Sequence, residues 1–403
     1  MKLLFVLNSG FDTYGPSLHL YKALFEDLLE AGHTVHLLES VSTRKDPVIP
    51  DSIGHHQNFS YELIPLTVTC KHHFVKRYLA GVYYSFCAIK YLKKQKKAEF
   101  DVVHVQSCPW APFLVTIIKK ILNLPTVFNI QDMFPGSSIA SGVMPKKWMQ
   151  KFFYKFQRVA YKRADIITVI SEDMKTRMVN QGVPAEKIRV IVNWYDDTFV
   201  KEIPWEENLF VKKNNMNKDK FYVQYAGTMG FVFDFKMVLD VATRLKKYED
   251  IIFQMIGFGS QYDDFIAAAK KGGLNNILFY PLEPQPMVPH VYSACSICFI
   301  PLKRDIIGNS VPSKAGLLMA CRRVIVNSVD EWSDYYQMFE REDMGLSASN
   351  LDPEAVTNCI LKLYSDRELI EHFANNAQIY GKSYYSRTVN TALYDQLYRS
   401  LSN

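Results

Sequence analysis

Residues 2–39 read KLLFVLNSGFDTYGPSLHLYKALFEDLLEAGHTVHLLE. The apolar run Lys2–Asn8 is typical of a buried strand, and Leu18–Ala31 has the spacing of an amphipathic helix. A glycine ends that helix just before a second apolar run, Thr34–Glu39, which we expect to be the next strand. A strand, a glycine-containing loop, a helix and a strand in this order predict a βαβ unit with parallel strands.

The same alternation continues on both sides of a polar segment without clear period, Tyr195–Asp219. The further strands that we expect are Val102–Gln106, Thr126–Asn129, Ile166–Ile170, Ile188–Val192, Phe221–Ala226, Ile251–Gly257, Ile277–Tyr280, Ile297–Pro301 and Arg323–Asn327. Helical patterns fill the gaps between them, so the chain is predicted to be an α/β protein of two Rossmann-like, doubly wound domains, residues 1–200 and 201–385. The carboxyl ends of the two sheets are expected to face a central cleft.

Length and composition agree with a two-domain globular protein. The chain has 403 residues, 48% of them hydrophobic and 22% charged, which argues against disordered, fibrous and disulfide-scaffold classes. A single core rarely grows beyond about 250–300 residues, so two domains are expected. The seven cysteines are scattered, as in reduced intracellular proteins, and Cys295-Ser-Ile-Cys298 lies in an apolar run, which favours strand packing over a metal site. The N-terminus has no signal-peptide pattern and no stretch is apolar for about 18 residues, so a cytoplasmic protein, soluble or surface-bound, is expected.

Positive charge is concentrated in the first half of the chain. Residues 1–200 contain 25 Lys and Arg against 17 Asp and Glu, and the whole chain carries a net charge of +6. Two stretches, Lys71–Lys97 and Pro145–Ala164, contain eight and seven basic residues and no acidic one. Such stretches indicate an anionic partner.

Three short motifs lie at predicted strand ends in the second half: Tyr225-Ala-Gly-Thr-Met-Gly230, Ile256-Gly-Phe-Gly-Ser-Gln261 and Gly308-Asn-Ser-Val-Pro-Ser-Lys314. Glycines at such turns let the backbone approach an anionic group, although they are also common for purely structural reasons. Lys314 begins a predicted helix, where a cation opposes the helix dipole, and this cost favours a bound anion such as a diphosphate.

The first half has a corresponding loop, Asn8–Ser17, and a carboxylate, Asp132, just after a predicted strand. Asp132 is either a functional acid or a cap of the following turn. No G-x-G-x-x-G fingerprint follows the first strand, which argues against an NAD enzyme, and phosphate-loop and metal-binding motifs are absent.

These motifs, in this order, resemble glycosyltransferase family 4, the retaining nucleotide-sugar transferases of the GT-B fold, and in particular the capsule and O-antigen subgroup that includes N-acetylfucosamine transferases. The resemblance covers essentially the whole chain. It rests on Leu18–Leu38, Asn129–Met144, Ala226–Gly230, Gly257–Ser260, Ser310–Lys314, Val324–Ser333 and Asp352-Pro-Glu-Ala355. It implies an acceptor-binding first domain, a donor-binding second domain and a last helix, within residues 386–403, that crosses back to the first domain.

The resemblance also implies site residues. Lys314 and Asp132 take the catalytic positions, Lys314 at the leaving diphosphate and Asp132 at the acceptor hydroxyl or the oxocarbenium-like sugar. The donor-binding positions are Gly15, Gly227, Thr228, Met229, Gly230, Lys236, Gly257, Gly259, Ser260, Leu282, Ser310, Val311, Pro312, Ser313, Lys314 and Asp330. No metal or other cofactor is expected, because the nucleotide-sugar is a substrate and Lys314 with helix N-termini serves the phosphates.

Three positions depart from the family pattern. Asn309 and Leu317 stand where the family usually has two glutamates, and Gln131 replaces a histidine before the catalytic aspartate. Leu317 cannot bind the ribose by hydrogen bonds, so the resemblance leaves that task to Asp330 or Glu331.

The basic stretches indicate how the acceptor is reached. Aromatic residues accompany the lysines of Phe74–Lys97, and such a segment either docks on an anionic membrane or is a core helix with a solvated lysine face. The membrane interpretation assigns docking to Lys76, Arg77, Lys90, Lys93 and Lys94. It fits a lipid-linked saccharide acceptor at the inner face of the cell membrane, whereas no nucleic-acid-binding motif accompanies the charge.

The sequence therefore predicts a glycosyltransferase for surface polysaccharide assembly, with a UDP-sugar donor favoured and an N-acetylamino-deoxyhexose as candidate sugar. Two alternatives remain at this point. One is a nucleotide-sugar epimerase on the same fold, which requires acid and base residues that are scarce here. The other is a catalytically silent partner subunit that has lost the two glutamates.

Overall fold

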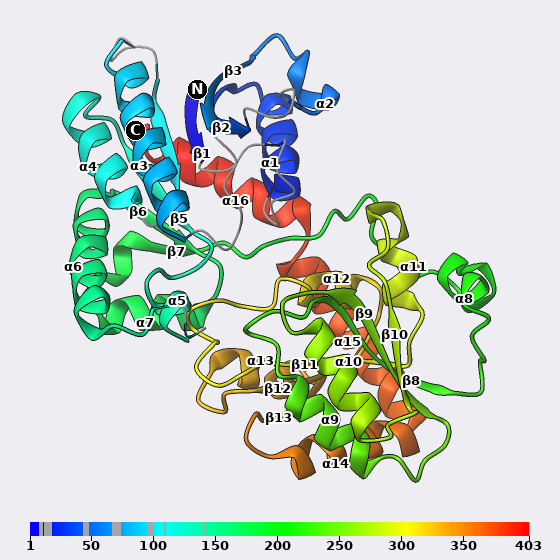
Figure 1. Ribbon diagram of the computed structural model, residues 1–403. Coiled ribbons are helices and arrows are strands. Elements are labelled where there is room, and N and C mark those ends of the chain that lie inside the picture. The colour runs from blue at the N-terminus through cyan, green and yellow to red at the C-terminus, as the bar shows by residue number, and fades with distance from the viewer. Residues whose placement is uncertain are drawn as a thin grey trace. The chain divides into compact units, whose positions relative to one another are not determined.

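The structure is a computed structural model that describes residues 1–7, 11, 18–42, 48–66, 74–94, 100–108, 110–140, 142 and 144–402 (Figure 1). The chain forms two compact units. Unit 1 consists of Met1–Val192 and Thr388–Asn403, and unit 2 consists of Asn193–Arg387.

The strands described for unit 1 form one parallel sheet in the order β3-β2-β1-β4-β5-β6-β7. They are β1 Lys2–Leu7, β2 Thr34–Ser42, β3 Phe59–Leu66, β4 Val102–Gln106, β5 Thr126–Ile130, β6 Ile166–Val169 and β7 Ile188–Val190. The apolar run that opens the chain lies at the centre of this sheet, where Leu3 pairs with both Val35 and Val102. Burial on both faces explains why this strand is apolar throughout.

Helices cover both faces of the unit 1 sheet. They are α1 Leu18–Glu30, α2 Asp51–Gly54, α3 Phe74–Leu92, α4 Ala111–Ile121, α5 Gly136–Ala140, α6 Lys147–Arg163, α7 Glu172–Asn180 and α16 Arg387–Ser400. The α1 and α16 helices cover one face, where the Phe5 ring contacts Tyr21 and Tyr398. The α3, α4 and α6 helices pack in series on the other face (Figure 1), where Phe128 contacts Tyr161.

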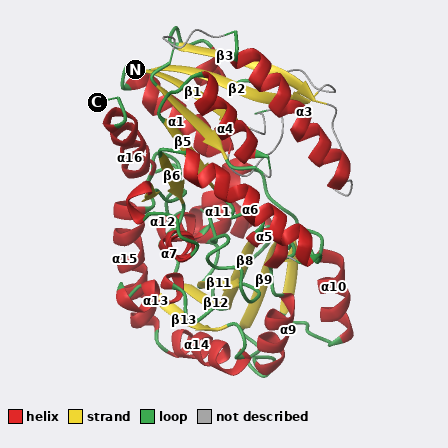
Figure 2. Ribbon diagram, turned by 90° about the vertical axis from the view of Figure 1, so that its left-hand side faces the viewer, coloured by secondary structure: helices red, strands yellow, loops and turns green. Residues whose placement is uncertain are grey.

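Unit 2 contains a second parallel sheet, in the order β10-β9-β8-β11-β12-β13 (Figure 2). Its strands are β8 Phe221–Thr228, β9 Ile251–Phe258, β10 Ile277–Tyr280, β11 Ile297–Pro301, β12 Ile325–Val329 and β13 Gly345–Ser349. Its helices are α8 Leu209–Lys213, α9 Phe235–Arg244, α10 Tyr262–Lys271, α11 Val288–Ser293, α12 Ala315–Ala320, α13 Asp334–Arg341, α14 Pro353–Ser365 and α15 Arg367–Tyr384.

Two apolar clusters lie on opposite faces of this second sheet. Tyr225 joins the larger cluster, with residues of α9, α10 and α14, whereas its neighbour Ala226 joins the smaller one, with residues of α8 and α11. Successive strand residues point to opposite faces, so a single strand such as β8 contributes residues to both clusters. The predicted α/β class with two Rossmann-like, doubly wound sheets is therefore confirmed.

Two strands were not anticipated from the sequence, and both lie at sheet edges. β3 is exposed at four of its first seven positions and contains Pro65, and β13 has the small, polar sequence GLSAS. The exposed positions of β3 interrupt the apolar run by which a strand is recognised, and an edge position tolerates its proline. β13 has no exposed position, but its residues are too small and polar to form such a run.

The units divide at Val192, before the predicted boundary at residue 200. The reason lies in a pair of backbone hydrogen bonds within unit 2. The Tyr195 N–H donates to the Tyr385 carbonyl at 3.0 Å, and the Arg387 N–H donates to the Tyr195 carbonyl at 3.0 Å. The start of the polar segment is thereby held against the end of α15.

In the part of the chain that the structure describes, no helix combines the length and the apolar character needed to cross a membrane.

Cys295 and Cys298 are buried free thiols whose sulfur atoms lie 3.6 Å apart, and burial raises the pKa of Cys298.

Candidate functional site

Two glycines lie side by side where β8 and β9 end. Gly227 pairs with Gly257 in the sheet register, and both have positive φ angles, +146° and +135°. A Cβ atom on Gly257 would lie 2.1 Å from the Gly227 carbonyl oxygen, and one on Gly227 would lie 2.7 Å from the Lys314 Nζ atom. Neither position has room for a side chain, so the backbone itself forms this edge.

The loops that follow the two strands are bound to each other. Met229 N–H donates to the Phe258 carbonyl at 2.8 Å, and a Cβ on Gly259 would lie 2.2 Å from the Met229 carbonyl oxygen. The Gln261 amide donates to the carbonyls of Gly230 and Phe233, while its oxygen accepts from Lys303 Nζ at 3.0 Å. Gln261 thus joins the two loops.

Lys314 lies directly beside this glycine edge. It occupies the N-cap position of α12, its Nζ donates to the Ala226 carbonyl at 2.9 Å, and its Nζ lies 3.5 Å from the centre of the Tyr225 ring. The aromatic face and the carbonyl are the groups that hold the ammonium, and no carboxylate pairs with it among the described residues. Burial lowers the pKa of Lys314 to about 7, so an incoming anion would favour its charged form.

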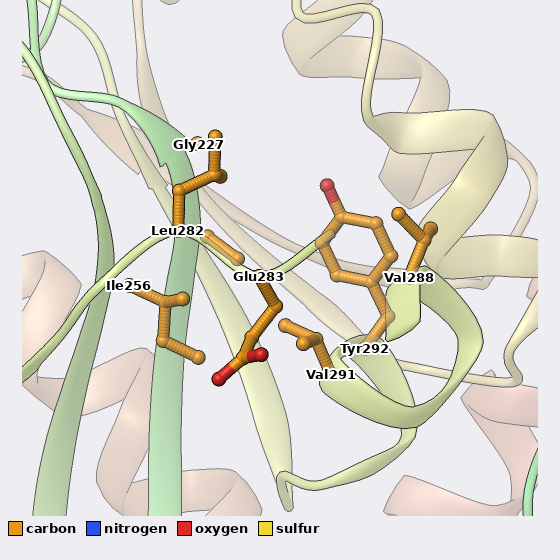
Figure 3. A pocket seen from close by; sticks show the side chains of 8 residues that line it. Gly227, Ile256, Leu282, Glu283, Val288, Val291 and Tyr292 are labelled. Carbon is orange, nitrogen blue, oxygen red and sulfur yellow. The ribbon is translucent and has the colours of Figure 1, made fainter. Parts of the chain in front are cut away.

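A pocket opens next to Gly227, with an empty volume of about 320 Å³ that is partly open to solvent (Figure 3). It is lined by Ala226, Gly227, Ile256, Leu282, Glu283, Val288, Val291 and Tyr292. Most of the lining is apolar, as is usual for small-molecule sites. The Glu283 side chain is only 8% exposed, and its Oε1 accepts a hydrogen bond from Lys213 Nζ at 2.7 Å.

The structure brings together some of the predicted donor residues and separates others. Gly227 and Leu282 share the pocket, with Lys314 beside Gly227. The Met229 side chain is fully buried in the core, so only its backbone is available to a ligand. Thr228, Lys236 and Ser260 are exposed, and none of the three lines the pocket.

The segment before α12 folds back on itself. Ser310 N–H donates to the Ile306 carbonyl at 3.1 Å, and the buried Asn309 donates from its side chain to the Asp305 carbonyl at 3.0 Å. Val311 and Pro312 are half-buried and Ser313 is exposed.

The structure also describes Asp330 and Glu331, the candidates for ribose recognition, and Leu317, and Glu331 is exposed. Asp330 is buried, and its Oδ1 accepts from the Asp305 N–H at 3.1 Å, so this carboxylate positions the loop. Leu317 is half-buried and does not line the pocket.

In unit 1, Asp132 is exposed just after β5. The preceding residue anchors this segment: the Gln131 amide donates to Asn129 Oδ1 at 3.1 Å, and the Gln131 N–H donates to Ser107 Oγ at 3.4 Å. The Ser107 N–H in turn donates to the Asn129 carbonyl at 2.7 Å. The aspartate therefore projects from an ordered strand end.

Asn129 belongs to a buried polar network that sequence reasoning missed. Its side-chain amide donates to Tyr394 Oη at 2.8 Å and its oxygen accepts from Tyr21 Oη at 3.2 Å. The two ring nitrogens of His104 lie 3.3 Å from Tyr21 Oη and 2.9 Å from Tyr398 Oη. Burial lowers the pKa of His104 to about 3, so the ring is neutral and serves the network as a donor and an acceptor.

The remaining predicted positions divide into two groups. Gly15 lies outside the described residues, and so do the side chains of Lys76 and Arg77. Lys90, Lys93 and Lys94 are exposed at the end of α3.

Sequence comparison matches two family models in succession. Residues 21–199 match "Glycosyltransferase Family 4" and residues 206–380 match "Glycosyl transferases group 1". A probable glycosyltransferase of Pseudomonas aeruginosa, WbjE, is 24% identical over 294 residues, which is 72% of each chain.

Solved structures resemble the whole chain in fold. The sucrose-phosphate synthase of Thermosynechococcus elongatus has a TM-score of 0.75 at 15% identity, with 99% of this chain and 98% of that chain covered. HepE of Anabaena, solved in complex with UDP and glucose, has a TM-score of 0.74 at 15% identity, with 98% and 99% covered.

Proposed function

The chain belongs to the glycosyltransferases of the GT-B fold, and we propose that it transfers a sugar from a nucleoside-diphosphate donor to a lipid-linked saccharide in surface polysaccharide assembly. The observation that carries the donor half of this proposal is Lys314 beside the Gly227–Gly257 edge. A cation held by a carbonyl and a ring, next to backbone without side chains, suits a diphosphate.

The pocket beside Gly227 supplies the second half of a nucleotide site in this proposal. Its mostly apolar lining is suited to a base or ribose, with the phosphates lying toward Lys314 beside Gly227. HepE has been solved with UDP, which favours a UDP-sugar as donor. An N-acetylamino-deoxyhexose is our candidate sugar, from the family resemblance alone.

In the proposed reaction, the chain has two tasks. Lys314 stabilises the negative charge that develops on the leaving diphosphate, and Asp132 orients the acceptor hydroxyl on the other substrate. We propose that transfer retains the configuration at the anomeric carbon, with no metal or other cofactor taking part. Chelator addition should leave the rate unchanged.

Location at the inner face of the cell membrane is also part of the proposal. At that surface the protein would meet a lipid-linked acceptor. The exposed Lys90, Lys93 and Lys94, at the end of α3, are among the groups that lie near the lipid.

Two observations weigh on the alternatives. Closure of the nucleotide pocket by Leu317 would favour a catalytically silent subunit, but Leu317 does not line the pocket beside Gly227. An epimerase requires an acid and a base at the donor sugar. Glu283, the carboxylate of that pocket, is paired with Lys213, which favours transfer over epimerisation.

The test is a calorimetric titration of the protein with UDP, GDP and ADP, repeated on Lys314→Ala. We expect micromolar binding of UDP that weakens by about tenfold or more in the variant, because a charge-assisted phosphate contact is lost. Lys270→Ala is the matched control, since Lys270 is exposed on α10, does not line the pocket and has no predicted role in the donor site. Failure of all three nucleotides to bind would contradict the donor site and favour the silent subunit.

A further inference from the structure

The outer side of α6 carries large apolar side chains in solvent. Trp148 is 68% exposed, Phe152 is 56% exposed and Val159 is 40% exposed. Their spacing of four and seven residues places them on one side of the helix, three turns long. We call this row the α6 stripe.

The α6 stripe is not needed to attach the helix to unit 1. The opposite side of α6 provides the buried residues Phe153, Gln157, Ala160 and Tyr161. Tyr161 contacts Phe128 of the central sheet, with the ring centres 6.2 Å apart. The helix, whose place in unit 1 is seen in Figure 1, is thus anchored through one side, and its other side carries exposed apolar residues.

Ring contacts hold Phe152 in place. Its ring stacks on that of Phe156, with the ring centres 6.0 Å apart and 15° between the planes. It also packs edge-to-face with the buried Phe153, with the ring centres 5.2 Å apart. Phe153 is itself fixed against Phe134, at 5.0 Å. A side chain that is already ordered loses little conformational freedom when a partner covers it.

Basic residues accompany the stripe along its whole length. Lys151, Lys155, Arg158 and Lys162 are exposed along one border of the stripe, and the segment Pro145–Ala164 contains no acidic residue. Among the residues that the structure describes, none of the four forms an ion pair with a carboxylate. The apolar row therefore lies in a field of uncompensated positive charge.

We propose that the α6 stripe and its basic border dock on an anionic lipid surface, with Trp148 and Phe152 entering the headgroup region. Exposed aromatic and aliphatic residues flanked by lysines and arginines are the composition of helices that lie in the plane of a membrane. Each basic residue near the surface adds attraction to anionic lipid. A second copy of this chain is disfavoured as the occupant, because a two-fold contact through α6 would place the same cations against each other.

This inference rests on the membrane location in the proposed function and deepens it. It assigns the contact with lipid to α6, while the basic end of α3 is at most a second contact. The contact with lipid does not depend on the donor, so lipid binding is measured without nucleotide.

The experiment measures binding to phosphatidylcholine vesicles with and without roughly 30% phosphatidylglycerol, by co-sedimentation at low and physiological salt. We expect binding only to the anionic vesicles, and weaker binding at higher salt. Trp148→Ser/Phe152→Ser and Lys151→Glu/Lys155→Glu should each reduce the partition coefficient by about tenfold or more. Lys246→Glu/Lys270→Glu, which makes the same charge change at exposed positions of unit 2, should retain binding.

Lipids brominated near the headgroup provide a second measurement. They should quench the tryptophan fluorescence of the unaltered chain, and Trp148→Phe should lose most of that quenching. UDP titration of every variant reports whether unit 2 is folded and whether the donor site exists, so failure of the lipid contact is distinguishable from failure of the proposed function.

Several outcomes would overturn the inference: no binding to anionic vesicles, binding unaffected by both α6 variants, or loss of binding only in Lys90→Glu/Lys93→Glu/Lys94→Glu on α3. Finding that Trp148→Ser converts a dimer to a monomer, or that the α6 stripe binds an acidic protein and not lipid, would overturn it too.

Discussion

The carboxyl ends of the two sheets have the same topology and opposite chemistry. In unit 2, the β8 and β9 ends are glycines with positive φ, and the neighbouring side chain is the cation Lys314. In unit 1, the β5 end bears the amides Asn129 and Gln131 and then the carboxylate Asp132. One edge is built to let an anion approach the backbone, and the other to present an acid on an ordered support.

Under the proposed function, the same kind of fold would bind a different substrate in each unit. The parallel sheet fixes where ligands bind, because its strand ends and helix starts lie at one edge. The residues placed there set the chemistry, so substitutions at the unit 1 edge and at the unit 2 edge should have separate effects on function.

The largest effect is expected at the unit 1 edge. Asp132→Asn should lower the rate of sugar transfer by roughly 100- to 10,000-fold, because it removes the carboxylate that we propose orients the acceptor. The affinity for UDP should stay within about twofold, as measured by calorimetry, since the change lies outside unit 2. A parallel loss of UDP binding would show that the two edges are not separate in function.

The next effect concerns the glycine edge. Gly257→Ala should weaken UDP binding by roughly 100-fold or more and lower the free energy of unfolding by about 2–4 kcal/mol, because its Cβ would overlap the Gly227 carbonyl. Gly273→Ala is the control, since Gly273 has φ +59° but its Cβ would meet only Lys246 Nζ at 3.7 Å. It should cost about 1–2 kcal/mol in urea denaturation and leave UDP binding unchanged.

A smaller effect distinguishes the cation from the backbone beside it. Because the pKa of Lys314 is lowered to about 7, a rise in pH above 7 removes the charge in the free protein, and UDP affinity should fall by at most about tenfold per pH unit. Lys314→Met should abolish this dependence between pH 7 and 9. A pH profile shared by both proteins would assign the effect to another group.

The same pKa has a consequence for stability. Since the pKa of Lys314 in the folded protein lies below the usual lysine value of 10.5, the unfolded chain binds more protons between pH 7 and 10.5, and stability rises with pH in that window. Lys314→Met should therefore raise the melting temperature at pH 7 more than at pH 10, by scanning calorimetry. An equal change at both pH values would contradict the lowered pKa.

The smallest effect is expected for the support of the carboxylate. Gln131→Ala removes the hydrogen bond to Asn129 Oδ1 and should lower kcat by about 2- to 10-fold, with the KM for the donor unchanged. Gln131→Glu, which keeps the length but places an acceptor against an acceptor, should be no better than alanine. Full rescue by glutamate would show that the hydrogen bond is irrelevant.

Much of the fold could be predicted because most of its strands are runs of large apolar residues. The predicted ranges Val102–Gln106, Ile277–Tyr280 and Ile297–Pro301 match the structure to the residue. β3 was missed because its exposed positions interrupt the apolar run, and β13 because its residues are small and polar. The edge strand β10 was found because its sequence, ILFY, is a run of large apolar residues. Runs of large apolar residues identify a strand, and this signal fails where a strand is exposed or its buried residues are small.

The candidate site was predictable only where backbone geometry leaves a mark in the sequence. Glycines after strands identified Gly227, Gly257 and Gly259 as positions without room for a side chain. Gln261 and Lys303 leave no such mark, because their importance comes from contacts between segments far apart in the chain. The exposure of Trp148 was equally hidden, since helical spacing alone does not tell a buried stripe from a solvent-facing one.

The grouping of α16 with unit 1 has a consequence for synthesis on the ribosome. Unit 2 is continuous in the chain, whereas Tyr394 and Tyr398, which bond Asn129 and His104 in unit 1, are made after it. Domains generally fold in the order in which they emerge. Here the unit begun first must wait, with the sheet face around Phe5 lacking the cover of α16, until all of its neighbour has been translated, so the nascent chain completes its units in reverse order.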